Sequence, residues 1–378
     1  MLPLPGLRKR KSEGSADQTC FETLCVAHGR SRPLACGREL LNGDQNESIA
    51  IIGAGSWGTA FAIMLAERYD EISLWAHEES VCASIQDRRE NEAFLPGFKI
   101  PAAIRPTNDI AEAVAGKSIV AFAVPTHHMR GIAEKAAPHL FPGACLVSLS
   151  KGVENGTLLR MTELLSTISP MHGPRVAVLS GPTFAGEIAH GKPAGATVAA
   201  INPNVARRLK FALCGSRFRL YSDDDVVGIE IGGALKNVMA IAAGICDGLE
   251  FGHNAMALLI SRGLAEIARL GIRLGAHPQT FAGLSGMGDL VLTCTGDLSR
   301  NRAVGIRVGR GEPISKILES MTMVAEGVLT ARSARELSRR EGVPMPISEQ
   351  VYCVLHEGKD AREAVSELFA RTLKSEKG

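Results

Sequence analysis

Residues 283–302 combine backbone freedom with groups that bind anions. The run GLSGMGDLVLTCTGDLSRNR contains four glycines, which permit tight, exposed turns. Ser299, Arg300 and Asn301 add a hydroxyl, a planar guanidinium and an amide at adjacent positions. Asp289, the lone acid in the early part of the run, suits orienting a polar group. The combination predicts a phosphate site, although a glycine-rich loop followed by a solvated basic helix has the same composition.

Lys236 is the residue best suited to proton transfer. It lies in the apolar run GGALKNVM of residues 232–239. Burial among such neighbours disfavours the ammonium form and lowers the pKa of a lysine toward the range useful for acid–base chemistry. A single lysine on a helix is more often a solvated surface group, and the apolar surroundings weaken that interpretation.

A glycine motif indicates where a dinucleotide binds. Gly53, Gly55 and Gly58 form the pattern G-x-G-x-x-G, which follows the β-rich run 48–52 and precedes the helix-compatible run 59–66. In the first turn of a βαβ unit, backbone N–H groups at a helix N-terminus bind the pyrophosphate of a dinucleotide. The pattern alone is weak in a chain with 40 glycines, but its flanking segments are those that a dinucleotide site requires.

The end of the next strand bears on the choice of cofactor. An Asp or Glu after this strand usually selects NAD by accepting hydrogen bonds from the ribose 2′-hydroxyl. Here the expected strand 71–75 is followed by Ala76, His77 and Glu78. His77 can approach a 2′-phosphate without the repulsion of a carboxylate, so we expect use of both NADP(H) and NAD(H), in a ratio left open. The alternative is that His77 is only a surface residue at the end of a strand.

Composition limits the class of protein. The chain has 378 residues, 45% hydrophobic and 22% charged, which suits two globular domains. A net charge of +2 gives no strong field for nucleic acid or an anionic membrane. The nine cysteines form no zinc-finger spacing, so we expect reduced thiols and no metal site. The longest apolar candidate, near residues 238–246, is shorter than the roughly 20 residues that span a bilayer, so we expect no transmembrane segment and a cytoplasmic protein.

Alternation of strands and helices predicts the domain organisation. Residues 48–227 alternate β-branched runs with helix-compatible stretches, which is typical of an α/β Rossmann-like domain with a largely parallel sheet. Residues 228–378 show helical patterns only and should form an all-α substrate domain, while residues 1–47 should be a disordered extension. Later strands are expected at 118–124, 144–149, 175–180 and 196–201, and a capping box at 360–363 should start the last helix. Loops at 124–126, 150–152 and 180–185 should share one rim, so that Lys151 and Thr183 become neighbours.

Five separated segments carry a resemblance to a known family. The glycine turn, Lys151-Gly152, GPTFA at 181–185, GALKN at 233–237, and GMGDL at 286–290 through SRNR at 299–302 occur in this order. The chain resembles bacterial-type NAD(P)-dependent glycerol-3-phosphate dehydrogenase over about residues 48 to 370. The family's fold, a Rossmann-like domain followed by an all-helical domain, agrees with the organisation expected above.

The resemblance also implies roles for individual residues. Lys236 matches the family's proton donor and acceptor, and Asn237 and Thr293 are supporting residues. Positions that contact substrate are matched by Lys151, Gly181, Thr183, Lys236, Asp289, Ser299, Arg300 and Asn301. Cofactor contacts are matched by Ser56, Trp57, His77, Lys151, Ala185, Arg300, Val324 and Glu326, beside the turn glycines Gly53, Gly55 and Gly58.

The implied activity is reversible reduction of dihydroxyacetone phosphate to sn-glycerol 3-phosphate with NADH or NADPH, supplying glycerophospholipid synthesis. The nearest rival within the enzymes is a 3-hydroxyacid or 6-phosphogluconate type dehydrogenase, whose substrates carry a carboxylate. A sensor of NAD(P)H without turnover is the rival from another class, but a sensor has no need for a lysine that transfers protons. Helices rich in Gly and Ala make a homodimer a reasonable expectation.

Overall fold

The computed structural model describes residues 47–321, 325–372 and 375. The expected extension of residues 1–47 therefore lies outside the described residues except for Glu47. That carboxylate accepts hydrogen bonds from Arg208 Nε at 2.6 Å and from Ser118 Oγ at 2.6 Å, beside the start of the first strand.

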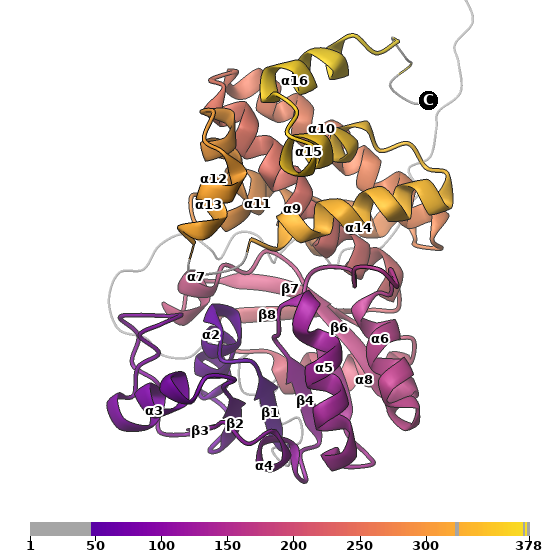
Figure 1. The fold of residues 1–378 in the computed structure, drawn as a ribbon. Helices are drawn as coiled ribbons and strands as arrows, with labels where there is room; N and C mark the ends of the chain where they lie inside the picture. The colour runs from indigo at the N-terminus through magenta and orange to yellow at the C-terminus, as the bar shows by residue number, and fades with distance from the viewer. Residues whose placement is uncertain (1–46, 322–324, 373–374, 376–378) are drawn as a thin grey trace, which may run out of the picture. The chain divides into compact units, whose positions relative to one another are not determined.

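Among the described residues, eight strands form one sheet in the order β3-β2-β1-β4-β5-β6-β7-β8 (Figure 1). Every neighbouring pair is parallel except β6 and β7, which run antiparallel. The strands are β1 (Ile49–Ile52), β2 (Ile72–Trp75), β3 (Ile104–Thr107), β4 (Ile119–Phe122), β5 (Cys145–Ser148), β6 (Val176–Ser180), β7 (Ala194–Ala199) and β8 (Phe218–Asp223).

Helices cover both faces of this sheet. Apolar residues of α2, α3 and α8 pack on one face, and those of α4, α5 and α6 pack on the other. The helices are α2 (Ser56–Leu65), α3 (Glu79–Arg88), α4 (Ile110–Val114), α5 (Thr126–Ala136), α6 (Met161–Ile168), α7 (Ala185–Ala189) and α8 (Pro203–Leu213), with 3₁₀ turns η1 (Ala137–His139) and η2 (Pro170–Arg175).

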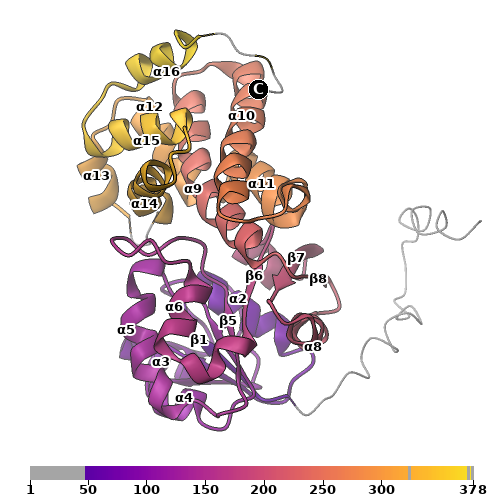
Figure 2. The ribbon, with the colours of Figure 1, turned by 90° about the vertical axis from the view of Figure 1, so that its right-hand side faces the viewer.

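The remaining described residues are helical, and their helices α9 to α16 gather together (Figure 2). Their core is formed mainly by α9, against which α10, α11, α12 and α14 pack. The elements are α9 (Val226–Gly248), α10 (Gly252–Arg273), η3 (Pro278–Ala282), the π-helical η4 (Leu284–Gly288), α11 (Asp289–Thr295), α12 (Arg300–Gly309), α13 (Ile314–Glu319), α14 (Glu326–Glu341), α15 (Pro346–His356) and α16 (Ala361–Phe369). This arrangement confirms the expected fold class, a Rossmann-like α/β domain followed by an all-α domain.

Burial explains which strands the sequence reveals. The inner strands β1, β4 and β5 are buried at every position because helices cover both faces, so they appear as continuous apolar runs. The edge strands β3 and β8 were not predicted. In β3 only Ile104 is buried, whereas the first four residues of β8 alternate between buried and exposed. Strand β3 also contains Pro106, which an edge strand tolerates.

The central helix α9 differs from expectation in its apolar length. Its 23 residues have a mean hydropathy of 1.5, so by length and composition it could cross a membrane, whereas we expected the apolar run there to be too short. Of its most apolar window, 94% is buried inside the protein, which is the environment of a core helix. Asp225 caps its start by accepting from the N–H of Gly228.

Candidate active site

The loops expected to hold ligands lie at one edge of the sheet. Strands β1, β2, β4, β5 and β6 are parallel, so their carboxyl ends meet at the same edge. These ends are followed by the glycine turn, His77, Thr126, Lys151 and Gly181 respectively. Lys151 Nζ lies 3.4 Å from Thr183 Oγ1, which confirms that these two residues are neighbours.

The glycine turn leaves room for a ligand in front of helix α2. Gly53 has a φ of +113° and its N–H donates to the Trp75 carbonyl at 3.0 Å, so a side chain there would be strained. A Cβ on Gly58 would lie 1.9 Å from the Gly53 carbonyl oxygen, so glycine permits the helix to begin close to the strand. A Cβ on Gly55 would meet nothing within 4 Å, and this open position at a helix N-terminus fits the pyrophosphate of a dinucleotide.

The other predicted cofactor residues flank this turn. His77 is exposed at the end of β2, with its ring 5.8 Å from that of Trp75. Ser56 Oγ donates to the Phe94 carbonyl at 2.6 Å. The indole N–H of Trp57 is buried with no partner among the described residues, although its ring packs on Phe61. Ala185 begins α7, and Val324 lies outside the described residues.

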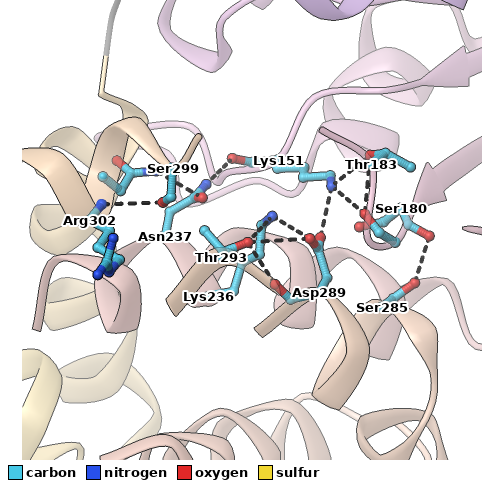
Figure 3. A network of polar contacts seen from close by, with 12 residues as sticks. Lys151, Ser180, Thr183, Lys236, Asn237, Ser285, Asp289, Thr293, Ser299 and Arg302 are labelled. Atoms are coloured by element: carbon cyan, nitrogen blue, oxygen red, sulfur yellow. Dashed lines mark hydrogen bonds and ion pairs between the residues drawn. The ribbon is translucent and has the colours of Figure 1, made fainter. Parts of the chain in front are cut away.

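Two lysines from different domains meet on one buried carboxylate (Figure 3). Asp289, at the start of α11, is 0% exposed. Its Oδ1 accepts from Lys236 Nζ at 2.5 Å, and its Oδ2 accepts from Lys151 Nζ at 2.7 Å. Lys151 Nζ also donates to the Gly181 carbonyl at 2.8 Å, and Lys236 Nζ to Thr293 Oγ1 at 2.8 Å. The two amines therefore converge on one carboxylate.

The surroundings of Lys236 lower its pKa from 10.5 to about 8. Burial is the largest cause, because the side chain lies in the apolar core of α9 with the residue only 6% exposed. The Asp289 carboxylate opposes this change by favouring the ammonium, and the charge of Lys151 adds to the lowering. A group with a pKa near neutrality can both give and accept a proton.

The predicted phosphate residues lie at the start of α12. Ser299 caps this helix, since its Oγ accepts from the Arg302 N–H at 3.2 Å. Arg300 is exposed, and its charge acts on the buried carboxyl of Glu326. Asn301 is buried, and its Nδ2 donates to Asn237 Oδ1 at 3.0 Å. An exposed guanidinium at a helix N-terminus is a suitable group for an incoming anion.

Glu326 links the helical domain to the cofactor side of the sheet. Its Oε1 accepts from the N–H of Thr126, the first residue of α5, at 3.3 Å. Burial raises the pKa of Glu326 to about 7, while the bond from Thr126 and the charge of Arg300 oppose the rise. The carboxyl therefore lies between the phosphate residues and the cofactor edge.

The sequence did not reveal two contacts of this site. Ser285 Oγ donates to the Ser180 carbonyl at 2.9 Å and joins the π-helical segment η4 to the end of β6. The N–H of Gly327 donates to Asn301 Oδ1 at 2.9 Å. A backbone N–H leaves no residue-type signal, although the position of Gly327 directly after Glu326 was the one available hint.

A glycine turn at a helix N-terminus, together with a buried lysine that can transfer protons, defines a nicotinamide-dependent dehydrogenase. The sequence family described as NAD-dependent glycerol-3-phosphate dehydrogenase N-terminus matches residues 48–206, and its C-terminal counterpart matches residues 225–366. The chain belongs to the NAD(P)-dependent glycerol-3-phosphate dehydrogenase family.

Individual relatives agree with this assignment. Glycerol-3-phosphate dehydrogenase (NAD(P)+) of Citrifermentans bemidjiense is 53% identical over 331 residues, which cover 87% of this chain and 99% of that protein. The enzyme of the same name from Myxococcus xanthus is 52% identical over 328 residues, covering 86% and 98%. A crystal structure of glycerol-3-phosphate dehydrogenase from Coxiella burnetii, 35% identical, superimposes with a TM-score of 0.83 and covers 87% of this chain and 100% of its own.

Proposed function

We infer that this protein is an NAD(P)-dependent glycerol-3-phosphate dehydrogenase. It reduces dihydroxyacetone phosphate to sn-glycerol 3-phosphate reversibly and supplies glycerophospholipid synthesis. The observation that carries the assignment, beside family membership, is the pair of lysines on buried Asp289 at the same edge of the sheet as the open glycine turn.

The bound cofactor supplies the hydride that reduces the carbonyl carbon. Negative charge then develops on the carbonyl oxygen, and Lys236 as the ammonium donates its proton there. Lys151 stabilises the same oxyanion by its charge, and Asp289 orients both amines. In the reverse direction neutral Lys236 accepts the proton from the hydroxyl.

The opposite end of the substrate is held by its phosphate. Arg300 provides an exposed charged donor, and Asn301 and Ser299 lie beside it. Binding energy from this end positions the carbonyl without taking part in bond making. Gly181 and Thr183 complete the substrate side through their contacts with Lys151.

The cofactor lies across the sheet edge in this proposal. The turn from Gly53 to Gly58 holds the pyrophosphate, and His77 faces the adenosine ribose. The remaining proposed contacts are Ser56, Trp57, Lys151, Ala185, Arg300, Val324 and Glu326. We propose that NADH and NADPH both serve, and Michaelis constants differing by more than about a thousandfold, or about 4 kcal/mol, would contradict dual use.

A direct assay tests the function. Absorbance of NADH or NADPH is followed for its loss after dihydroxyacetone phosphate or a 3-oxoacid is added with the reduced cofactor. It is followed for its appearance after 6-phosphogluconate is added with the oxidised cofactor. Turnover with the phosphate ketone alone supports the proposal, turnover with the carboxylate substrates supports the rival dehydrogenases, and cofactor binding without any turnover supports a sensor. Lys236→Ala should lower kcat by about 10²–10⁴-fold with cofactor affinity little changed. Near-normal turnover would remove Lys236 from its role.

Three further properties belong to the proposal. We propose a homodimer, which fits the exposed Leu258 and Ile272 on α10 and which light scattering of the purified protein tests. We propose a cytoplasmic location, which fractionation tests. We also propose the domain boundaries 1–47, 48–227 and 228–378, which limited proteolysis tests.

A further inference from the structure

A chain of hydrogen bonds runs in one direction through the phosphate end of the site. The Gly327 N–H donates to Asn301 Oδ1 at 2.9 Å, and Asn301 Nδ2 donates to Asn237 Oδ1 at 3.0 Å. Asn237 Nδ2 then donates to the Lys151 carbonyl at 3.4 Å (Figure 3 shows this last contact). The donors come from α14, α12 and α9 in turn, and the chain ends on the loop after β5.

This direction fixes the orientation of both amides. A backbone N–H can only donate, so the atom of Asn301 that faces Gly327 must be its oxygen. The Asn301 nitrogen then faces Asn237, and only one of its two N–H groups donates to a described residue. The second N–H stays available for an anion. Without the Gly327 N–H, the Asn301 amide would lose the contact that distinguishes its oxygen from its nitrogen.

The lack of a side chain at Gly327 is required for this contact. A Cβ there would lie 2.6 Å from the Asn237 carbonyl oxygen, 2.8 Å from Asn301 Oδ1 and 2.8 Å from Ile241 Cδ1. The first of these atoms belongs to the backbone of α9 and cannot rotate away. A substitution would therefore push the first turn of α14 away from Asn301.

We propose that Gly327 is a positioning residue for the phosphate site, acting through the amide of Asn301. This inference rests on the proposed function, in which Asn301 and Arg300 bind the substrate phosphate. The same turn of α14 carries Glu326, whose carboxylate contacts the Thr126 N–H. Gly327 thus also fixes the position of the phosphate site relative to the cofactor edge of the sheet.

The test is a double-mutant cycle on substrate kinetics. Gly327→Ala should raise KM for dihydroxyacetone phosphate by about tenfold or more, the effect of losing one hydrogen bond to a charged group, while kcat changes much less. Asn301→Ala should raise KM similarly. The double variant should resemble Asn301→Ala alone, because Gly327 acts through that amide. Gly131→Ala is the matched control, since a Cβ on that helical glycine would meet nothing within 4 Å, and the KM of this variant should stay at the wild-type value.

Several outcomes would overturn the inference. Additive effects of the two substitutions, or an unchanged KM in a folded Gly327→Ala protein, would show that Gly327 does not act through Asn301. If Gly327→Ala does not fold by circular dichroism, Asn237→Ala replaces that variant in the cycle, because Asn237 makes the other contact that holds the Asn301 amide. Additive effects of Asn237→Ala and Asn301→Ala would equally refute the chain of hydrogen bonds as the means of positioning Asn301. Absence of turnover in the wild-type protein would instead contradict the proposed function.

Discussion

Replacing Asp289 by asparagine should separate the two directions of the reaction. The carboxylate is the group that favours the ammonium form of Lys236, against burial and the charge of Lys151. Asparagine keeps the size and one acceptor but removes the negative charge. An opposite charge within about 4–6 Å typically changes a pKa by about 1–3, so the pKa of Lys236 should fall from about 8 to between about 5 and 7.

The consequence can be worked out at pH 7. With a pKa of about 8, about nine-tenths of Lys236 carries the proton, whereas with a pKa of about 6 only about one-tenth does. Reduction of dihydroxyacetone phosphate needs the ammonium form of Lys236. Because the protonated fraction falls about tenfold at pH 7, kcat/KM for reduction should fall about tenfold as well. Oxidation of glycerol 3-phosphate needs the neutral amine, so its rise with pH should begin at a lower pH.

The assay is a pair of pH profiles of kcat/KM, one in each direction, for wild type and Asp289→Asn. In wild type, reduction should decline and oxidation should rise through about pH 8. Both midpoints should move to lower pH in the variant. Asp297→Asn is the control, because that carboxylate is 95% exposed and should leave both midpoints in place. Midpoints that stay at about 8 or move upward in Asp289→Asn would refute the electrostatic reasoning.

Three other substitutions test the helix packing, a buried acid and the cofactor edge. In Gly244→Ala the new Cβ would lie 2.1 Å from the Arg302 carbonyl oxygen, so α9 and α12 must separate. This should lower the free energy of unfolding in urea by about 1–3 kcal/mol or more, while Gly131→Ala should be neutral or stabilising. Equal stability of the two variants would contradict tight packing of the helices. Burial raises the pKa of Glu266 to about 7, above its unfolded value. The protonated carboxyl therefore contributes stability that is fully present below about pH 4.5 and is lost as pH rises through 7. Glu266→Gln should flatten the dependence of Tm on pH between about 5 and 8, and parallel profiles of the two proteins would exclude this linkage. His77→Asp should raise KM for NADPH relative to NADH by about tenfold, or about 1.4 kcal/mol, and an unchanged ratio would show that the ribose edge lies elsewhere.

The sequence predicted those parts of the fold that local patterns determine. The inner strands appear as apolar runs because both faces are buried. Asp360 starts α16 as expected by accepting from the N–H groups of Arg362 and Glu363, which is one half of the expected capping box. The edge strands β3 and β8 could not be predicted from apolar runs, since an edge position leaves most of their residues polar or exposed. The length of uninterrupted apolar sequence also underestimated α9, because Glu230 and Lys236 interrupt it although both are buried.

The site was predictable only at the level of single motifs. The glycine turn and the basic run each have a local signature, and the resemblance supplied their association. The contact of Asp289 with both lysines depends instead on how distant segments converge, since Lys151 is 138 positions away in sequence and Lys236 is 53. Partner atoms in the backbone, such as the Gly327 N–H, are present at nearly every residue and so carry no sequence signal.

The glycines before Lys236 explain how α9 can pack closely against both segments that supply contacts to the two lysines. A Cβ on Gly232 would lie 2.6 Å from the Ser285 carbonyl oxygen, and a Cβ on Gly233 would lie 2.6 Å from Ser180 Oγ. Ser285 lies in the segment that leads into Asp289, and Ser180 precedes the carbonyl that holds Lys151. Each glycine within a helix costs about 0.5–1 kcal/mol relative to alanine, so their presence here trades helix stability for close approach. Because a misplacement of about 1 Å can cost a hundredfold in rate, this approach is part of what makes Lys236 competent to transfer a proton.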